Sequence, residues 1–99
     1  MTGHVVEIAT FSAKRGVTEQ ALLKAAVRSD RFVAAQPGFV SRRFVRREDG
    51  RWIDIIEWQS AQAARMAADK FATAAQVQDF MATIGDDAQL QHLPLLHSR

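Results

Sequence analysis

The 99-residue sequence contains no cysteine, no tyrosine and no asparagine, and it has only two prolines. Without cysteine the chain forms no disulfide, has no thiolate nucleophile and offers no thiolate ligand to zinc. No stretch approaches the ~18 consecutive apolar residues of a membrane-spanning helix. The N-terminal residues lack a basic segment followed by an apolar one, so the sequence does not indicate a signal peptide. These absences predict a cytoplasmic protein.

The composition is that of one globular domain, which we expect to span residues 1–99. Apolar residues make up 47% of the chain and charged residues 24%, both ordinary for a globular protein. A domain of this size buries only part of its surface, so its core is modest and a partner subunit would help to stabilise it.

The segment 38–59 carries the clearest structural signal, because two runs rich in β-branched and aromatic residues flank Asp49-Gly50. This pattern predicts a β-hairpin with a two-residue type I′ turn. A two-residue loop pairs residues whose numbers sum to 99, so that Val45 faces Asp54.

The predicted register gives the hairpin two different faces. One face carries Val40, Phe44, Ile53 and Ile55, with Arg42 and Glu57 paired across it. The other face carries Phe39, Arg43, Val45, Arg47, Trp52, Asp54, Ile56 and Trp58. We expect the first face to meet the helices. The second face is too apolar to stay in water on so small a monomer, which predicts a homodimer formed sheet against sheet.

The remaining elements follow from hydrophobic periodicity and from start and stop signals. We expect a strand at 4–11, a helix at 18–36 ended by Pro37, a helix at 61–71 capped by Ser60, a helix that begins at a Thr73–Gln76 capping box and ends at Gly85, and a strand at 88–97. The order β-α-β-β-α-α-β predicts an α+β, ferredoxin-like βαββαβ fold. Its four-stranded antiparallel sheet has the order 4-1-3-2, with the helices on one face.

Two acidic residues inside predicted strands are the candidate catalytic groups. A desolvated Asp54 would have a raised pKa and would be able to take a proton from an acidic aromatic substrate. Strands one and three are expected to be parallel neighbours in the centre of the sheet, so Glu7 could approach Asp54. The alternatives are structural: an ion pair of Asp54 with Arg43 or Arg47, and an ion pair of Glu7 with an arginine at the dimer face.

Apolar side chains between the helices and the sheet form a candidate ligand site. The predicted ligand-binding residues are Phe44, Trp52, Trp58, Met66, Phe71, Phe80 and Met81. Side chains at this spacing also serve simply as core, and that alternative stays open.

The three histidines, His4, His92 and His97, do not predict a metal site. His4 and His92 fall on strands that would be adjacent, but no third ligand has a clear spacing from them. We therefore expect no metal, and we expect these histidines at the surface or at an interface.

Five arginines crowd the hairpin and raise the alternative of nucleic-acid binding. They are Arg42, Arg43, Arg46, Arg47 and Arg51. An RNA-recognition domain has the same order of elements, but its third strand carries a glycine-aromatic signature. The third strand here, RWIDIIEWQ, has no glycine and contains two acids. We expect no nucleic-acid partner and predict that the arginines pair with Glu48, Asp54 and Glu57.

The segments VVEIATFSAKRG, QPGF and IIEWQSAQAA resemble the antibiotic biosynthesis monooxygenase family of dimeric α/β barrels. The resemblance spans nearly the whole chain in the order of elements. It implies a homodimer that binds a small apolar or aromatic molecule. Some members oxygenate polycyclic aromatic substrates without a cofactor, others degrade haem, and others are isomerases. Haem-degrading members use asparagine, tryptophan and histidine, so the absence of asparagine leads us to expect no haem and no other cofactor.

Two functions therefore stay open. The first is a cofactor-free monooxygenase or isomerase, and the second is a non-catalytic ligand-binding or interaction module on the same fold. An open cavity that contains an ionisable group with a perturbed pKa would favour the first. A space filled by Phe44, Phe71, Phe80 and Met81 would favour the second.

Overall fold

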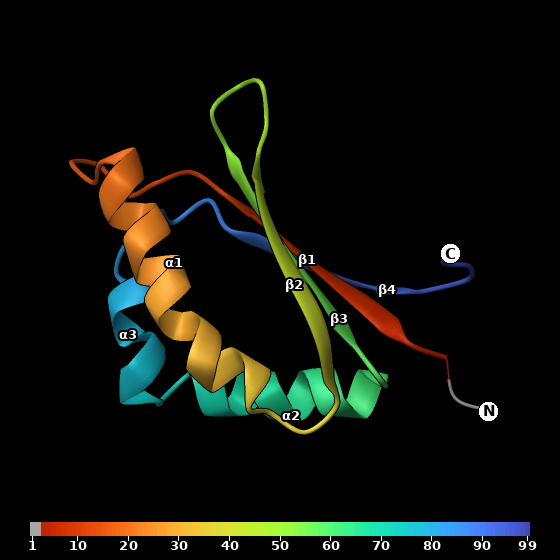
Figure 1. Cartoon of the computed structure of the whole chain (residues 1–99). Coiled ribbons are helices and arrows are strands. Elements are labelled where there is room, and N and C mark those ends of the chain that lie inside the picture. The colour runs from red at the N-terminus through yellow and green to blue at the C-terminus, as the bar shows by residue number, and fades with distance from the viewer. Residues whose placement is uncertain (1–2) are drawn as a thin grey trace.

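The computed structural model describes residues 3–99 and contains one antiparallel sheet covered by helices on a single face (Figure 1). The elements are β1 (Val5–Phe11), α1 (Glu19–Ala34), β2 (Phe39–Arg46), β3 (Trp52–Trp58), α2 (Ala61–Phe71), α3 (Ala75–Met81) and β4 (Gln89–Pro94). The strands lie in the order β2-β3-β1-β4, which is the predicted 4-1-3-2 read from the other edge. The predicted ferredoxin-like fold is thus confirmed. Within residues 3–99, no helix has both the length and the apolarity to cross a membrane.

Two details of the predicted sheet are wrong. β1 and β3 are adjacent, as expected, but they run antiparallel and not parallel. The hairpin register is shifted by one residue, so that Phe44 faces Asp54 and Arg42 faces Ile56. The loop has three residues, because the Arg47 N–H donates to the Arg51 carbonyl at 2.7 Å, and Gly50 alone has a positive φ of 89°. Asp49 stays at negative φ, which a type I′ turn does not allow.

The shifted register also changes which face of the hairpin meets the helices. Trp52, Ile56 and Trp58 are buried beneath the helices, whereas Ile53 and Ile55 point to the opposite face and are half-buried. The prediction that Ile53 and Ile55 of β3 meet the helices is therefore wrong. Burying two indoles removes more apolar surface from water than burying two isoleucines, which explains the choice of face.

Local signals set the helix boundaries, with one exception. The Thr18 hydroxyl accepts a hydrogen bond from the Ala21 N–H, and the Ser60 hydroxyl accepts one from the Ala63 N–H. These caps start α1 and α2. The predicted Thr73–Gln76 capping box does not form, because the N-cap of α3 is Ala74 and no side chain caps it.

Gly85 does not end α3, as had been predicted, because that helix already has its C-cap at Ala82. The Gly85 N–H donates to the Ser12 carbonyl at 2.8 Å. A Cβ atom at Gly85 would lie 2.9 Å from that oxygen, so the close approach of the two backbones explains the glycine.

The core consists of two clusters on the helix-facing side of the sheet. The first contains Phe11, Leu22, Ala25, Ala26, Trp52 and Phe80. The second contains Val33, Ile56, Trp58, Ala64 and Ala67. Phe44 stacks on Trp52 with ring centroids 5.2 Å apart, which extends the first cluster along β2. The two clusters leave space between them, and that space holds the candidate site.

The face of the sheet that the helices do not cover carries several apolar residues among polar ones such as Arg43 and Glu57. Strand alternation places on it Val6 and Ile8 of β1, Val45 of β2, Ile53 and Ile55 of β3 and Leu93 of β4. Val45 and Leu93 are 41% and 43% exposed, so this far face is open to a partner.

We predict that Gly38→Ala destabilises the fold more than Gly16→Ala. Both glycines have a φ of +86°, so both variants incur the left-handed strain of about 1–2 kcal/mol. At Gly38 the new Cβ atom would also lie 2.5 Å from the Ala63 Cβ, whereas nothing lies within 4 Å at Gly16. We expect a further loss of about 1–3 kcal/mol at Gly38, measured by urea unfolding. Equal losses at the two positions would contradict the close packing of Gly38 against Ala63 of α2.

Candidate functional site

A cavity of about 330 Å³ lies between the sheet and the helices. Its apolar wall includes Phe11, Val33, Ile56, Phe71, Phe80 and Met81. Its polar wall comprises Glu7, Ser29, Arg42, Asp54 and Gln89. A largely apolar cavity with a few convergent polar groups is typical of a small-molecule site.

The polar wall is ordered by the sheet register. Arg42 pairs with Ile56, Ile56 with Glu7, and Glu7 with His92, so these four residues form one row across β2, β3, β1 and β4. Asp54 lies one step away on the same face, diagonal to both Arg42 and Glu7. The helix-facing side of the sheet therefore brings together four ionisable side chains, one from each strand. They surround the apolar Ile56.

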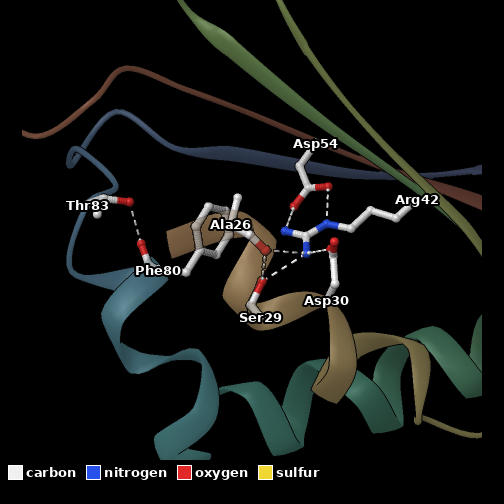
Figure 2. A network of polar contacts seen from close by, with 7 residues as sticks. All are labelled: Ala26, Ser29, Asp30, Arg42, Asp54, Phe80 and Thr83. Atoms are coloured by element: carbon white, nitrogen blue, oxygen red, sulfur yellow. Dashed lines mark hydrogen bonds and ion pairs between the residues drawn. The ribbon is translucent and has the colours of Figure 1, made fainter. Parts of the chain in front are cut away.

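Arg42 is the most heavily hydrogen-bonded side chain of the site (Figure 2). Its Nε and Nη2 donate to the two carboxylate oxygens of Asp54 at 2.9 and 2.8 Å. Its Nη1 reaches α1, where Ser29 Oγ, Asp30 Oδ1 and the Ala26 carbonyl accept at 2.8, 2.9 and 3.2 Å. Burial disfavours the charged guanidinium, but Asp54 and Asp30 outweigh it and raise the pKa of Arg42.

Glu7 is buried at 7% exposure, and His92 Nε2 lies 3.0 Å from its Oε1. Burial raises the pKa of Glu7 above its ordinary value, and the nearby negative charge of Asp54 raises it further. The hydrogen bond and charge of His92 lower the pKa of Glu7 but do not cancel the effect of burial. The Trp58 Nε1 lies near Glu7 but has no partner in hydrogen-bonding geometry.

The two candidate acids therefore differ in how many of their oxygens already accept hydrogen bonds. Both oxygens of Asp54 accept hydrogen bonds from Arg42, so its charge is matched by the guanidinium. Only Oε1 of Glu7 has a hydrogen-bond partner among residues 3–99. A carboxylate with one free oxygen beside an apolar cavity is the better placed proton acceptor.

The predicted site residues separate into three groups. Glu7, Asp54, Phe71, Phe80 and Met81 line the cavity. Phe44, Trp52 and Trp58 face the helices but do not line it, because they pack into the two core clusters. Met66 is 48% exposed and faces outward on α2, at a separate hollow that His92 also lines.

Several predicted ion pairs have other partners. Asp54 pairs with Arg42, and not with Arg43 or Arg47, because the register is shifted by one residue. Glu7 pairs with a histidine on the helix-facing side, and not with an arginine. Glu57 pairs with His4 at 2.5 Å, and not with Arg42.

Three of the other four hairpin arginines also contact carboxylates, whereas Arg43 has no ion pair among residues 3–99. Arg46 pairs with Glu19, Arg47 with Asp49, and Arg51 with Asp87. The partners differ from the predicted Glu48 and Glu57. No group of three His, Cys, Asp or Glu side chains within residues 3–99 is arranged to hold a metal ion.

Sequence reasoning missed Arg42, Ser29 and His92. The signal for Arg42 was present in the hairpin, because a three-residue loop ending in Gly50 places it diagonal to Asp54. His92 follows from the pairing of β4 with β1, whose phase the sequence pattern does not fix.

Compared by sequence, the chain matches no protein-family model and no curated protein. Its structure is similar to a variant of SnoaB, a cofactor-independent oxygenase from Streptomyces nogalater, with a TM-score of 0.79 and 18% identity over 98% of this chain and 97% of that chain. A candidate antibiotic biosynthesis monooxygenase from Bordetella bronchiseptica has a TM-score of 0.78 and 15% identity over 97% and 100% of the two chains. The haem-degrading protein Rv3592 from Mycobacterium tuberculosis has a TM-score of 0.76 and 20% identity over 100% and 98%.

The chain has the fold of the antibiotic biosynthesis monooxygenases. At these identities the similarity concerns the fold, and the resemblance predicted from the sequence is confirmed at that level. Proteins with this fold have different chemistries. The function of this chain therefore has to be inferred from the side chains of the cavity.

We predict that the free energy of unfolding of the wild type falls as the pH rises, and that Glu7→Gln removes the part of this fall that Glu7 causes. The pKa of Glu7 is higher in the folded than in the unfolded chain, so the folded state holds the proton more strongly. Wild-type stability therefore decreases as the pH rises from the ordinary glutamate value through the folded pKa. The contribution of Glu7 to this slope should be absent in Glu7→Gln, as measured by urea unfolding at several pH values.

The exposed Glu48→Gln is the matched control for this experiment and should keep the wild-type slope. If Glu7→Gln had the same pH dependence as the wild type, burial would not govern the protonation of Glu7.

Proposed function

We propose that the protein is a cofactor-independent, monooxygenase-like enzyme that binds a flat aromatic molecule in the cavity. The observation that carries the proposal is a buried carboxyl with a raised pKa in the polar wall of a largely apolar cavity. The open volume of about 330 Å³ favours a ligand site over a filled core. The fold shared with SnoaB supports an oxygenase.

The reaction begins with a proton transfer. The Glu7 carboxylate takes a proton from an acidic ring carbon, and the electron pair spreads into the aromatic system. The carbanion transfers an electron to dioxygen, and the two radicals combine to form a carbon–oxygen bond. The peroxide takes the proton back from Glu7 and then loses water, so that a CH₂ group becomes a carbonyl and Glu7 is regenerated. Dioxygen is the oxidant, and its second oxygen atom leaves as water.

Asp54 has a different part in this proposal. Its two oxygens hold Arg42 at 2.9 and 2.8 Å, and Arg42 in turn contacts α1. We assign Asp54 to positioning Arg42, and Glu7 alone to proton transfer.

The residues that line the cavity do not fit a haem. They include no histidine, cysteine or tyrosine side chain that would ligate the iron. Met81 contributes only a thioether. Globins, peroxidases and related proteins hold haem iron through a strong axial ligand of these kinds. We expect no stoichiometric Soret shift when haem is added, and a tight complex would contradict this assignment.

Anthrone is a suitable probe, because it is flat, aromatic and carries an acidic CH₂ group. We expect the wild type to convert anthrone to anthraquinone above the rate in buffer, in the presence of a metal chelator, with one dioxygen consumed per anthrone. Glu7→Gln should lower this rate by about 10²-fold or more, the size of a general-base effect. Glu48→Gln should retain the wild-type rate.

Each outcome of the anthrone experiment decides between the functions. Binding is measured by the quenching of tryptophan fluorescence. Binding without turnover would indicate that the protein is a non-catalytic ligand-binding module. Absence of both binding and turnover would overturn the proposal.

We also propose that a second copy of the chain covers the far face of the sheet. Six apolar residues on that face lie on four strands, and monomers rarely expose so continuous an apolar patch. Sedimentation should give twice the chain mass of 11.0 kDa. Ile55→Glu on the far face should give the monomer, whereas Val27→Glu, at a 59% exposed position on α1, should not. A wild-type monomer at micromolar concentration would contradict the dimer.

A further inference from the structure

We infer that Arg42 is a catalytic residue of the cavity, which donates a hydrogen bond from Nη2 to a carbonyl oxygen of the bound aromatic molecule. The carbonyl oxygen gains negative charge when Glu7 removes the proton, and Arg42 stabilises that charge. This inference rests on the proposed function and narrows its substrate to a neutral aromatic ketone. The acidic carbon of this ketone is conjugated with its carbonyl group.

The first support is the hydrogen-bond inventory of the guanidinium, which has five N–H bonds. Nε and one hydrogen of Nη2 are used by Asp54. The two hydrogens of Nη1 are shared among Ser29, Asp30 and the Ala26 carbonyl (Figure 2). One hydrogen of Nη2 has no acceptor among residues 3–99. The guanidinium thus retains a single donor.

The second support is where this donor lies. The side chain of Arg42 is only 7% exposed and lines the cavity. The guanidinium carbon is 5.3 Å from the ring centroid of Phe80, which also lines the cavity. A donor in such apolar surroundings interacts more strongly with an oxygen than it would in water. A ligand oxygen in the cavity would complete the hydrogen bonding of Arg42.

The third support is the distance between Arg42 and Glu7. They flank Ile56 in the row across the sheet, one on each neighbouring strand. Two strand spacings place their backbones about 10 Å apart. A flat ring that lies over Ile56 is therefore flanked by the strand that carries the proton acceptor and the strand that carries the hydrogen-bond donor. Negative charge reaches the oxygen that Arg42 contacts only if the acidic carbon is conjugated with the carbonyl.

Charge favours a neutral ketone over a permanent anion. Arg42 is already paired with Asp54 and with the exposed Asp30, and Glu7 and its partner His92 complete the ionisable groups that face this row. An anionic ligand would enter beside three carboxyl groups and one guanidinium. A neutral ketone avoids this repulsion, because negative charge reaches its oxygen only as Glu7 loses its own. A donor fixed where charge develops lowers the barrier without reorganisation.

The test uses two probes with the same ring system, 4-nitro-1-naphthol and 1-nitronaphthalene. Visible absorption distinguishes the naphthol from the naphtholate, so it gives the pH midpoint at which the bound probe ionises. We expect Arg42 to lower this midpoint in the wild type relative to the variants. Arg42→Met/Asp54→Asn should raise it by about one pH unit, a tenfold change in the ionisation constant. This double variant removes the two buried charges together and leaves neither unpaired.

Arg42→Lys is the second variant, because it keeps a positive charge beside Asp54 but loses the planar set of donors. We expect an intermediate midpoint. The neutral 1-nitronaphthalene should bind the wild type and the variants with dissociation constants within about twofold of one another. Equal binding of this probe would show that the cavity is intact in the variants. If the role of Arg42 were purely structural, equal binding would not be expected.

The outcomes separate the inference from the proposed function. If both probes bind and the midpoint is the same with and without Arg42, or changes only in Glu7→Gln, the inference fails and the proposed function stands. If neither probe binds the wild type, the cavity is not an aromatic site and both fail.

Discussion

The buried ion pair between Arg42 and Asp54 is the interaction on which the site depends. It joins two adjacent strands, and through Ser29, Asp30 and the Ala26 carbonyl it fixes α1 over the sheet. Moving both charges out of water is costly, and close bidentate geometry offsets that cost. α1 packs onto the sheet in apolar contact within both core clusters, and the cavity lies between these clusters, with Arg42 and Asp54 in its wall.

In the proposed function, Glu7 transfers the proton and Arg42 stabilises the developing charge. Burial makes a negative charge on Glu7 unfavourable, which strengthens it as a base once it is ionised. Arg42 keeps its charge because Asp54 and Asp30 raise its pKa. Ile56 between them offers an apolar surface on which a ring can lie. In the proposed function, this row combines proton transfer, ring binding and charge stabilisation.

Much of the fold could be predicted from local patterns, whereas the site depended on one register. Ser60 and the alanine stripe after it fix α2 residue by residue, and Pro37 ends the first helix region close to its observed end at Ala34. Asp49-Gly50 is compatible with loops of two or three residues, and only the packing of Trp52 and Trp58 selects the longer one. Glu7 and Asp54 could be recognised because acids inside apolar strands are unusual. Arg42 could be recognised only by choosing the three-residue loop, and His92 could not, because its partner depends on how β4 is aligned with β1.

The most direct test of this account is a crystal structure with 9,10-anthraquinone, which has two carbonyl groups on opposite sides of one ring. We predict that the ring lies over Ile56 in the cavity, with one carbonyl oxygen within hydrogen-bonding distance of Arg42 Nη2 and the opposite carbonyl directed toward Glu7. A ring bound on the far face of the sheet, or a cavity closed to the ligand by Phe71 and Phe80, would contradict it.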